Sequence, residues 1–347
     1  MLIIKMSSLG DVVHTLPAIT DLAAQGAEIH WVVEEAFVPI VAAHPGVARI
    51  LPIAWRRWRR QLPKFWQRQA GAAGRELAAF RWQLKDTQYD LVIDAQGLYK
   101  SAIVARQAHS ARRLGLDRDS AREPGAARFY SEGVAVAKDQ HAVDRVRQLV
   151  AQAAGYELPT QLRFGLHDEQ AQRQPASANT CVLLHGTTWA SKHYPEQLWI
   201  ELAQHASAAG FQPVLTWGDA VEERRAQRIA AASGASLWPR MSLTELIQRL
   251  RTATVAIGVD SGIAHLCGAL GVPTLGLYGA TNATLTGVRG AHSQNMAAEF
   301  ACAPCVRRDC GYTGPQVLHN AAAVEPACFG QLLPASVWRA ASELAAG

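Results

Sequence analysis

Short apolar runs alternate with helix-like segments along nearly the whole chain, and this alternation restricts the possible folds more than any other feature. In the first half, residues 2–6, 28–35 and 89–97 form strand-like runs. A helix-like segment at 12–24 follows the first run, and Pro17 predicts a late start or a kink in it. Strands that alternate with helices build βαβ units and parallel sheets. The pattern therefore predicts an α/β fold.

The same alternation returns in the second half of the chain. There we predict strands and helices in turn at 181–186, 195–210, 212–218, 242–251, 254–260, 261–271 and 273–279, the last of these being a strand. Residues 158–180 between the halves are polar and rich in Gln, Pro and Ala, which predicts a linker. A chain of 347 residues has room for two domains. We place them at 1–165 and 166–347, with the last helix free to pack back on the first domain.

Some classes of protein are excluded by what the sequence lacks. It has no run of about 20 apolar residues, which a bilayer-spanning helix requires, and its N-terminus lacks the apolar core of a signal peptide. We therefore expect a cytoplasmic protein in which the six cysteines are thiols or ligands rather than disulfides. Four of them, with one histidine, have partial zinc-ligand spacing, but free thiols in a loop explain them better: Cys302, Cys305, Cys310, His319 and Cys328.

The net charge of +5 is unevenly distributed. Basic residues and tryptophans are interleaved after Trp55, the basic ones being Arg56, Arg57, Arg59, Arg60, Lys64 and Arg68. Arginine binds phosphate through two parallel hydrogen bonds, and tryptophan favours boundaries between apolar and polar surroundings. The cluster predicts an anionic partner, which could be a phosphate, a membrane surface or nucleic acid. A solvated basic helix face is the alternative.

A turn motif, Ser7-Ser8-Leu9-Gly10-Asp11, follows the first predicted strand. Its glycine permits a tight turn, so that the Asp11 carboxylate emerges at the carboxyl end of the strand. There Asp11 can act as a general base that takes a proton from an attacking hydroxyl. Capping of the next helix explains the residue equally well. No Gly-x-Gly-x-x-Gly pattern is present here, which argues against an NAD-dependent oxidoreductase.

Two loops of the second half suit phosphate. Asp260-Ser261-Gly262 joins a strand directly to a helix, whose first N–H groups are free to bind an anion, and His265 lies one turn further on. A helix cap followed by a core histidine is the alternative. The other loop carries two hydroxyls and then an ammonium, from Thr187, Thr188 and Lys192. Lys192 could neutralise a leaving diphosphate, although a solvated lysine is the commoner situation.

Weaker signals complete the set. Trp217 and Glu222 follow the next strand, where an aromatic face could pack on a base and a carboxylate could bind ribose hydroxyls. Asp117 and Asp119 form an Asp-x-Asp pair, which binds metal and nucleotide in some enzymes. This pair lies in a charged stretch without strands, so we interpret it as solvated surface.

Taken together, these segments resemble the family-nine glycosyltransferases, the bacterial lipopolysaccharide heptosyltransferases. Matching stretches occur in both halves and in the family's order: KMSSLGDVVHTLPA, WVVEE, RRWRR, YDLVIDAQGLYKSA, SAREP, HGTTWASKHYPEQLW, TWG…EE, MSL and VDSGIAHLCGAL. The resemblance implies a GT-B glycosyltransferase fold, with two Rossmann-like doubly wound domains facing a cleft. It also implies that L-glycero-D-manno-heptose moves from ADP-heptose to the Kdo of Kdo-lipid A in inner-core synthesis. The family's reaction inverts the anomeric carbon and uses no metal or other cofactor.

Residue by residue, the resemblance places Asp11 on the catalytic base and Lys192 on the lysine at the diphosphate. It implies an ADP-heptose site in the C-terminal domain that contains Thr187, Thr188, Lys192, Glu222, Met241, Asp260, Ser261, Gly262 and His265. Acceptor binding in the N-terminal domain falls to Arg56, Arg57, Arg60 and Arg122. Ser261 stands where threonine is common, and it keeps the hydroxyl.

The resemblance also implies the setting of the reaction. We expect a monomer, peripheral on the cytoplasmic face of the inner membrane, that binds no nucleic acid. The cysteine-rich stretch resembles a sibling enzyme that adds a later heptose, whereas KHYP, RRWRR and AREP favour the enzyme that adds the first. The alternatives are that sibling, or a non-catalytic binder of anionic glycolipid.

Overall fold

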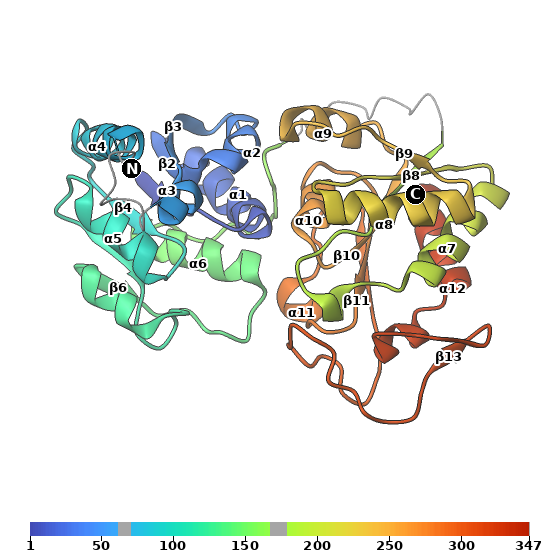
Figure 1. Ribbon diagram of the computed structural model, residues 1–347. Coiled ribbons are helices and arrows are strands. Elements are labelled where there is room, and N and C mark those ends of the chain that lie inside the picture. Colours follow the sequence, from blue (N-terminus) through green and yellow to red (C-terminus); the bar gives the residue numbers. More distant parts are fainter. Residues whose placement is uncertain (62–70, 167–178, 347) are drawn as a thin grey trace. The chain divides into compact units, whose positions relative to one another are not determined.

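The computed structural model describes residues 1–61, 71–166 and 179–346. The chain divides into two compact units, Met1–Leu166 and His167–Gly347 (Figure 1). Of the expected linker, 167–178 lies outside the described residues, as do Lys64 and Arg68 of the basic cluster.

The first unit is built on one parallel sheet of six strands in the order β3-β2-β1-β4-β5-β6. The strands are β1 (Leu2–Ile4), β2 (Ile29–Glu34), β3 (Val47–Ile53), β4 (Val92–Asp94), β5 (Arg113–Leu116) and β6 (Glu132–Val134). Every residue of β1, β2 and β4 is buried, so both faces of the sheet centre are covered. These are the three strands that the sequence predicts.

The other three strands escape the sequence pattern. β3 is a half-exposed edge strand that contains Pro52 and Arg49, whose guanidinium pairs with Asp86 at 2.9 Å. β5 contains Gly115, against which the Tyr130 ring packs so closely that a Cβ there would clash. The run at 89–97 is therefore the fourth strand of its sheet and not the third, as the sequence suggested.

The helices of the first unit are α1 (Leu9–Ala24), α2 (Val38–Ala42), α3 (Trp55–Gln61), α4 (Gly71–Lys85), α5 (Tyr99–Gln107) and α6 (Ala142–Ala154). The prediction of a late start for α1 is wrong, because the helix begins at Leu9 and includes Pro17. A buried ion pair joins α1 to α6, with Arg147 Nε 2.7 Å from Asp21 Oδ2. The same guanidinium donates to the Pro159 carbonyl at 2.7 Å, which fixes the chain just after α6.

The second unit repeats this topology. Its sheet is parallel, with strands in the order β12-β11-β10-β7-β8-β9. They are β7 (Thr180–Leu184), β8 (Gln212–Leu215), β9 (Ser236–Leu237), β10 (Val255–Val259), β11 (Thr274–Tyr278) and β12 (Ser293–Ala297). Counted from the first strand of each unit, both sheets have the order 3-2-1-4-5-6, which is that of a doubly wound α/β fold. The predicted fold class is confirmed.

The helices of the second unit are α7 (Glu196–Ala208), α8 (Ala220–Ser233), α9 (Leu243–Leu250), α10 (Gly262–Ala269), α11 (Ala283–Thr286) and α12 (Pro334–Ala346). The predicted capping box of α9 is confirmed, since the Ser242 backbone N–H donates to Glu245 at 2.7 Å. β11 is not the last strand, because β12 and the pair β13 (Leu318–His319) and β14 (Ala322–Ala323) follow. The last helix, α12, buries Val337 and Ala341 in the core of its own unit.

This topology determines where ligands can bind. In a 3-2-1-4-5-6 sheet the connections leave strands 1 and 4 in opposite directions, which opens a crevice at their carboxyl ends. In the first unit the loops after β1 and β4 flank this crevice, and in the second unit the loops after β7 and β10 do so. Within the described part of the chain, none of the helices has the length and hydropathy that a bilayer span requires.

Candidate active site

Asp11 lies in the first turn of α1, directly after β1. Its Oδ2 accepts hydrogen bonds from the backbone N–H of Ser8 at 2.6 Å and from the Ser8 hydroxyl at 2.9 Å. The carboxylate therefore does cap its helix, which was the plainer of the two interpretations. Its side chain is nevertheless 45% exposed, and Oδ1 lies 3.9 Å from the ammonium of Lys5. Asp11 thus keeps one oxygen available beyond its capping role.

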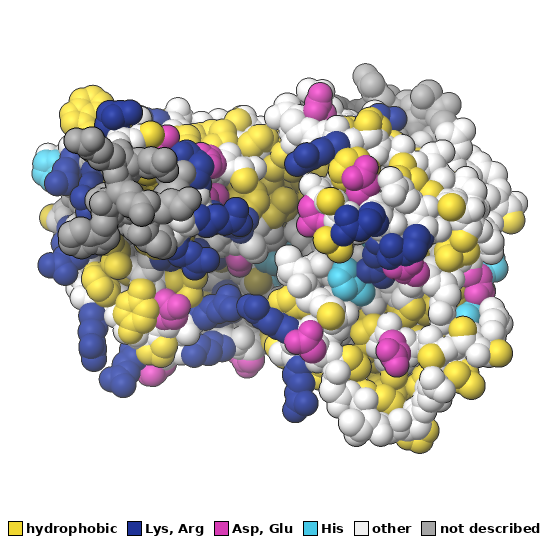
Figure 2. Space-filling view, viewed as in Figure 1, with side chains coloured by type: hydrophobic (Ala, Val, Ile, Leu, Met, Phe, Trp, Pro, Cys, Tyr) yellow, Lys and Arg dark blue, Asp and Glu magenta, His cyan; other side chains and the backbone are white. Residues whose placement is uncertain are grey.

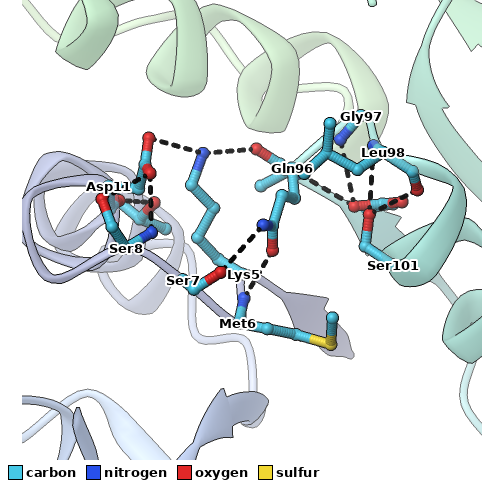
Figure 3. Close-up of polar contacts among 12 residues, drawn as sticks. Lys5, Met6, Ser7, Ser8, Asp11, Gln96, Gly97, Leu98 and Ser101 are labelled. Atoms are coloured by element: carbon cyan, nitrogen blue, oxygen red, sulfur yellow. Dashed lines mark hydrogen bonds and ion pairs between the residues drawn. The ribbon is translucent and has the colours of Figure 1, made fainter. Parts of the chain in front are cut away.

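Lys5 connects the two loops of the crevice. Figure 3 shows this side chain between Asp11 and the loop after β4, where its Nζ donates to the Ala95 carbonyl at 2.9 Å. Gln96 in that loop accepts from the Met6 backbone N–H at 2.8 Å and donates to Ser7 Oγ at 3.3 Å. Buried Asp94 fixes this loop, because its carboxylate accepts a hydrogen bond from the Gln96 backbone N–H at 2.9 Å. The position of Asp11 is therefore supported from both strands.

A pocket of about 650 Å³ opens above these loops. Five cationic side chains and one carboxylate, that of Asp11, are among its described lining residues, the cations being Lys5, Lys100, Arg122, Lys138 and Arg145. Lys100 donates to Ser7 Oγ at 2.8 Å, and burial lowers the pKa of its ammonium. Burial also lowers the pKa of Arg145, whose guanidinium donates to the Ser120 carbonyl at 2.9 Å. The pocket therefore suits an anionic ligand that carries a hydroxyl for Asp11.

The arginines of α3 are placed differently, since none of them lines this pocket. Arg57 pairs with Glu35 at 3.0 Å and with Glu76 at 2.7 Å, and these hydrogen bonds raise its pKa above the usual range. The Arg56 guanidinium lies 5.3 Å from the centre of the Phe37 ring. Arg60 is exposed. Of the four arginines predicted to bind the acceptor, only Arg122 lines the pocket that contains Asp11.

In the second unit, the Asp260 carboxylate contacts three polar side chains. It lies 2.7 Å from Lys192 Nζ, accepts the Thr281 hydroxyl at 2.7 Å and lies 3.3 Å from His265 Nε2. Burial alone would raise the pKa of Asp260, but the contacts with His265 and Lys192 outweigh it and hold the pKa well below its usual range. The loops after β7 and β10 are therefore joined by an ionised carboxylate.

Further polar groups surround Asp260. The Lys192 ammonium also lies 4.5 Å from the centre of the Trp189 ring, and the Thr187 hydroxyl donates to the Asp260 carbonyl at 3.1 Å. Ser261 is the N-cap of α10 and accepts from the Ala264 backbone N–H at 3.3 Å. An ammonium, hydroxyls and a helix N-terminus thus converge at this crevice, as a diphosphate requires.

Glu222 lies against the same loop. Its carboxylate accepts from the Gly218 backbone N–H at 2.8 Å and packs so closely on Gly186 that a Cβ at that position would be 2.5 Å from it. Burial raises the pKa of Glu222. Trp217, next to Gly218, is oriented by a 3.0 Å hydrogen bond from its indole N–H to the Trp238 carbonyl. Thr188 is exposed and Met241, just before α9, is half-buried.

The sequence pattern of glycosyltransferase family 9 (heptosyltransferase) matches residues 77–314, which is more than half of the chain. The chain belongs to glycosyltransferase family 9. Lipopolysaccharide heptosyltransferase 1 of Pseudomonas aeruginosa is 46% identical to this family 9 enzyme over 97% of the chain and 95% of the relative. The structure of Escherichia coli heptosyltransferase WaaC with ADP matches with a TM-score of 0.81 and 36% identity, over 99% of both chains.

A second structure, WaaC with ADP-2-deoxy-2-fluoro heptose, matches with a TM-score of 0.78 and 36% identity, over 99% of this chain and 98% of that one. These likenesses confirm the expected GT-B fold and the glycosyltransferase class.

Sequence reasoning about this family 9 enzyme missed several residues. Lys5, Lys100, Lys138 and Arg145 are single cations in separate segments, and only the strand order brings them to one pocket. Thr281, which binds Asp260, lies in a loop after β11 without any motif.

Four of the cysteines in this family 9 enzyme, Cys302, Cys305, Cys310 and Cys328, line a pocket of about 410 Å³. All six cysteines are free of disulfides. His319, the histidine of the predicted zinc-ligand set, pairs with Glu201 at 2.6 Å. Asp117, from the Asp-x-Asp pair, accepts a hydrogen bond from the Ser120 backbone N–H at 2.8 Å. Among the described residues, no three His, Cys, Asp or Glu side chains are arranged to hold a metal ion.

Proposed function

We propose that this enzyme transfers L-glycero-D-manno-heptose from ADP-heptose to a hydroxyl of the Kdo in Kdo-lipid A, with inversion of the anomeric carbon. The first unit would bind the acceptor and the second unit the sugar nucleotide. The relatives named lipopolysaccharide heptosyltransferase 1 and the WaaC complex with a fluorinated ADP-heptose support this choice of reaction.

One observation carries the assignment of the acceptor to the first unit. Its pocket surrounds the Asp11 carboxylate with five cationic side chains. Recognition of a neutral sugar does not require a cationic pocket. Kdo, in contrast, carries a carboxylate, and lipid A carries phosphates. Charge-assisted hydrogen bonds from lysine and arginine recognise both groups.

The proposed step uses one proton and one leaving group. Asp11 takes the proton of the attacking Kdo hydroxyl as that oxygen bonds to the anomeric carbon of heptose. The bond between the anomeric carbon and the diphosphate oxygen breaks, and ADP leaves with the electron pair. Lys192 turns toward the diphosphate and neutralises the charge that develops there. Asp260 also contacts His265 and Thr281 in the structure, so it would keep two partners when Lys192 turns away.

An assay with defined substrates tests this proposal. Purified protein incubated with ADP-heptose and Kdo-lipid A should release ADP and increase the acceptor mass by one heptose. The same turnover is expected after treatment with a chelator and desalting, because the charge-stabilising groups are side chains. No transfer to Kdo-lipid A, together with transfer to an acceptor that already carries heptose, would favour the sibling enzyme. Binding of both substrates without turnover would favour a glycolipid binder.

A second prediction separates the pocket cation Arg122 from the α3 arginines. Arg122→Ala should raise the KM for Kdo-lipid A about tenfold, which corresponds to the loss of one charge-assisted hydrogen bond. The kcat and the affinity for ADP-heptose should change little. Arg60→Ala serves as the matched control, because Arg60 does not line the pocket. Steady-state kinetics with varied acceptor gives the answer, and a larger KM effect from Arg60→Ala would move acceptor binding to α3.

We also propose that the enzyme works as a monomer, peripheral on the cytoplasmic face of the inner membrane. Its acceptor is anchored there by acyl chains, so the enzyme must come to the bilayer. The unit that carries the cationic pocket would face the lipid.

A further inference from the structure

Helix α4 has an exposed stripe that mixes one large aromatic side chain with cations. Arg75, Ala78, Trp82 and Lys85 follow one another at helical spacing and are all exposed, and Arg81 is exposed beside them. Trp82 is 68% exposed, which is more than any other large hydrophobic side chain in the described residues. A tryptophan that serves only the core has no reason to be so accessible.

Helix α5 presents a similar stripe next to it. Tyr99, Ile103 and Arg106 occupy one face at i, i+4 and i+7, and the two hydrophobic residues are 48% and 43% exposed. The two helices are neighbours, since Arg81 Nε donates to Gln107 Oε1 at 2.7 Å. Three of the eight large hydrophobic side chains most exposed in the described residues therefore belong to α4 and α5.

The charge around these stripes has one sign. The sequences of α3, α4 and α5 contain nine lysines and arginines and a single acid, Glu76. Glu76 is already bound by Arg57 and by the indole N–H of Trp58, at 2.7 and 2.9 Å. Figure 2 shows that Lys and Arg side chains spread over the visible face of the first unit, with hydrophobic side chains among them.

Two acids that lie beside α4 and α5 have partners of their own. Asp86, after α4, binds Arg49 at 2.9 Å. Glu123 accepts the Tyr99 backbone N–H at 2.6 Å. Asp86 is thus paired with a cation, and Glu123 is the one of these two acids whose negative charge remains beside the stripes.

We propose that the exposed faces of α4 and α5 form a docking surface for an anionic lipid bilayer, with Trp82, Tyr99 and Ile103 entering the headgroup region and Arg75, Arg81, Lys85 and Arg106 binding lipid phosphates. We call these seven residues the α4–α5 face.

The composition of the α4–α5 face fits a bilayer better than a protein partner. Tryptophan and tyrosine favour the membrane interface, where the ring meets acyl chains and the polar edge stays hydrated. Long cationic side chains reach the phosphates of the same layer. Each basic residue near an anionic surface contributes about 1 kcal/mol, or roughly a fivefold gain in affinity, so four of them give reversible binding. Salt weakens this kind of attraction.

The proposal deepens the proposed function and rests on it in one respect, namely that the acceptor is embedded in a membrane. Lys100 is the second residue of α5 and lines the Asp11 pocket. The helix that presents Ile103 and Arg106 to lipid therefore begins at the acceptor site. Docking through this face would place the pocket of the same unit near the sugar headgroups.

Vesicle flotation with the full chain tests the α4–α5 face directly. The wild type should float with vesicles of phosphatidylcholine and phosphatidylglycerol, should float less as salt rises, and should stay unbound with phosphatidylcholine alone. The charge variant Arg81→Glu/Lys85→Glu should bind the anionic vesicles more than about thirtyfold more weakly, since two attractions of about 1 kcal/mol are lost and two repulsions are added. Trp82→Ser should weaken binding about fivefold or more.

A matched control lies on another surface helix. Val221 on α8 is 67% exposed, and Arg224 is exposed on the same helix. Val221→Ser/Arg224→Glu removes an exposed hydrophobic side chain and reverses one charge, and it should bind vesicles like the wild type. Equal binding by the α4–α5 variants and the wild type would overturn the proposal. So would equal binding of the wild type to neutral and anionic vesicles, or a dimer in sedimentation that Trp82→Ser dissociates, which would assign the face to a second copy.

Activity assays keep this proposal separable from the proposed function. With a water-soluble Kdo acceptor that lacks acyl chains, the Trp82 and charge variants should turn over at the wild-type kcat. With acceptor embedded in anionic vesicles, their KM should rise in step with the loss of vesicle binding. Absence of transfer by the wild type in both assays would contradict the proposed function, whereas flotation would still decide the docking surface.

Discussion

Replacing Asp11 with alanine should lower kcat by about 10²- to 10⁴-fold, the range lost when a general base is removed. The affinity for ADP-heptose should stay within about a factor of two, because the proposed donor residues belong to the other unit, His167–Gly347. Single-turnover kinetics with saturating acceptor and calorimetry with ADP-heptose measure the two quantities. A near-normal kcat in the folded variant would remove Asp11 from the proposed mechanism.

The helix cap requires a control, since Asp11 accepts two hydrogen bonds from Ser8. Loss of a cap destabilises a helix by about 1 kcal/mol, which could disturb the loop without any chemistry. Asp11→Asn retains an oxygen that can accept from the Ser8 backbone N–H but cannot serve as the base. We therefore expect Asn to restore the thermal stability lost in the alanine variant while kcat stays low. Recovery of kcat in Asp11→Asn would show that capping is the whole role of this side chain.

Lys192→Met should lower kcat by about 10²- to 10³-fold, the usual cost of removing one group that stabilises a developing negative charge. Methionine keeps an unbranched stem against Trp189, so the change removes charge and little packing. Affinity for ADP should fall as well, since the ammonium would contact the diphosphate in the bound state. Lys192→Arg retains the charge and should recover part of the activity. Unchanged kcat and unchanged ADP affinity in Lys192→Met would exclude the proposed role.

The same variant has a pH signature in stability. In the wild type the pKa of Asp260 is held below its usual range despite burial, by His265 and Lys192. A lowered folded pKa stabilises the protein above the unfolded pKa, near 3.9, and this contribution disappears as the pH falls through the folded value. Without Lys192 the folded pKa rises and the contribution shrinks. Thermal unfolding should therefore show a difference between wild type and Lys192→Met at neutral pH that narrows below about pH 4.

Strands that are buried on both faces could be predicted from the sequence, and so could β8, in which only Gln212 is exposed. The remaining strands could not. β1, β2, β4, β7, β10 and β11 are mainly apolar, because helices cover both sides of the sheet centre. β3 contains Arg49 and Pro52 because it lies at the sheet edge. β5 contains Gly115 because the Tyr130 ring occupies the space of a side chain. Edge position and ring packing are tertiary facts, which local patterns do not record.

The residues of the candidate site also divide into those that could be found from the sequence and those that could not. Asp11, Lys192 and Asp260 could be found because each follows a predicted strand in a loop with a distinctive residue order. Lys138 and Arg145 could not, since they come from the region after β6 and from α6, and an isolated cation is usually solvated. In the sequence, the cluster of arginines in α3 is a stronger signal than these isolated cations. In the structure, however, Arg57 forms ion pairs with Glu35 and Glu76. Density of charge in a sequence says little about which charges remain available.

Both units have the strand order 3-2-1-4-5-6, each with its own sheet and its own core. A substitution beside β1 and β4 therefore leaves the packing around β7 and β10 intact. Under the proposed division of labour, the glycan that is extended and the nucleotide sugar that is consumed are specified by separately folded scaffolds. Either preference can drift under selection while the other stays fixed, so a lineage can acquire a new acceptor without having to rebuild its donor pocket.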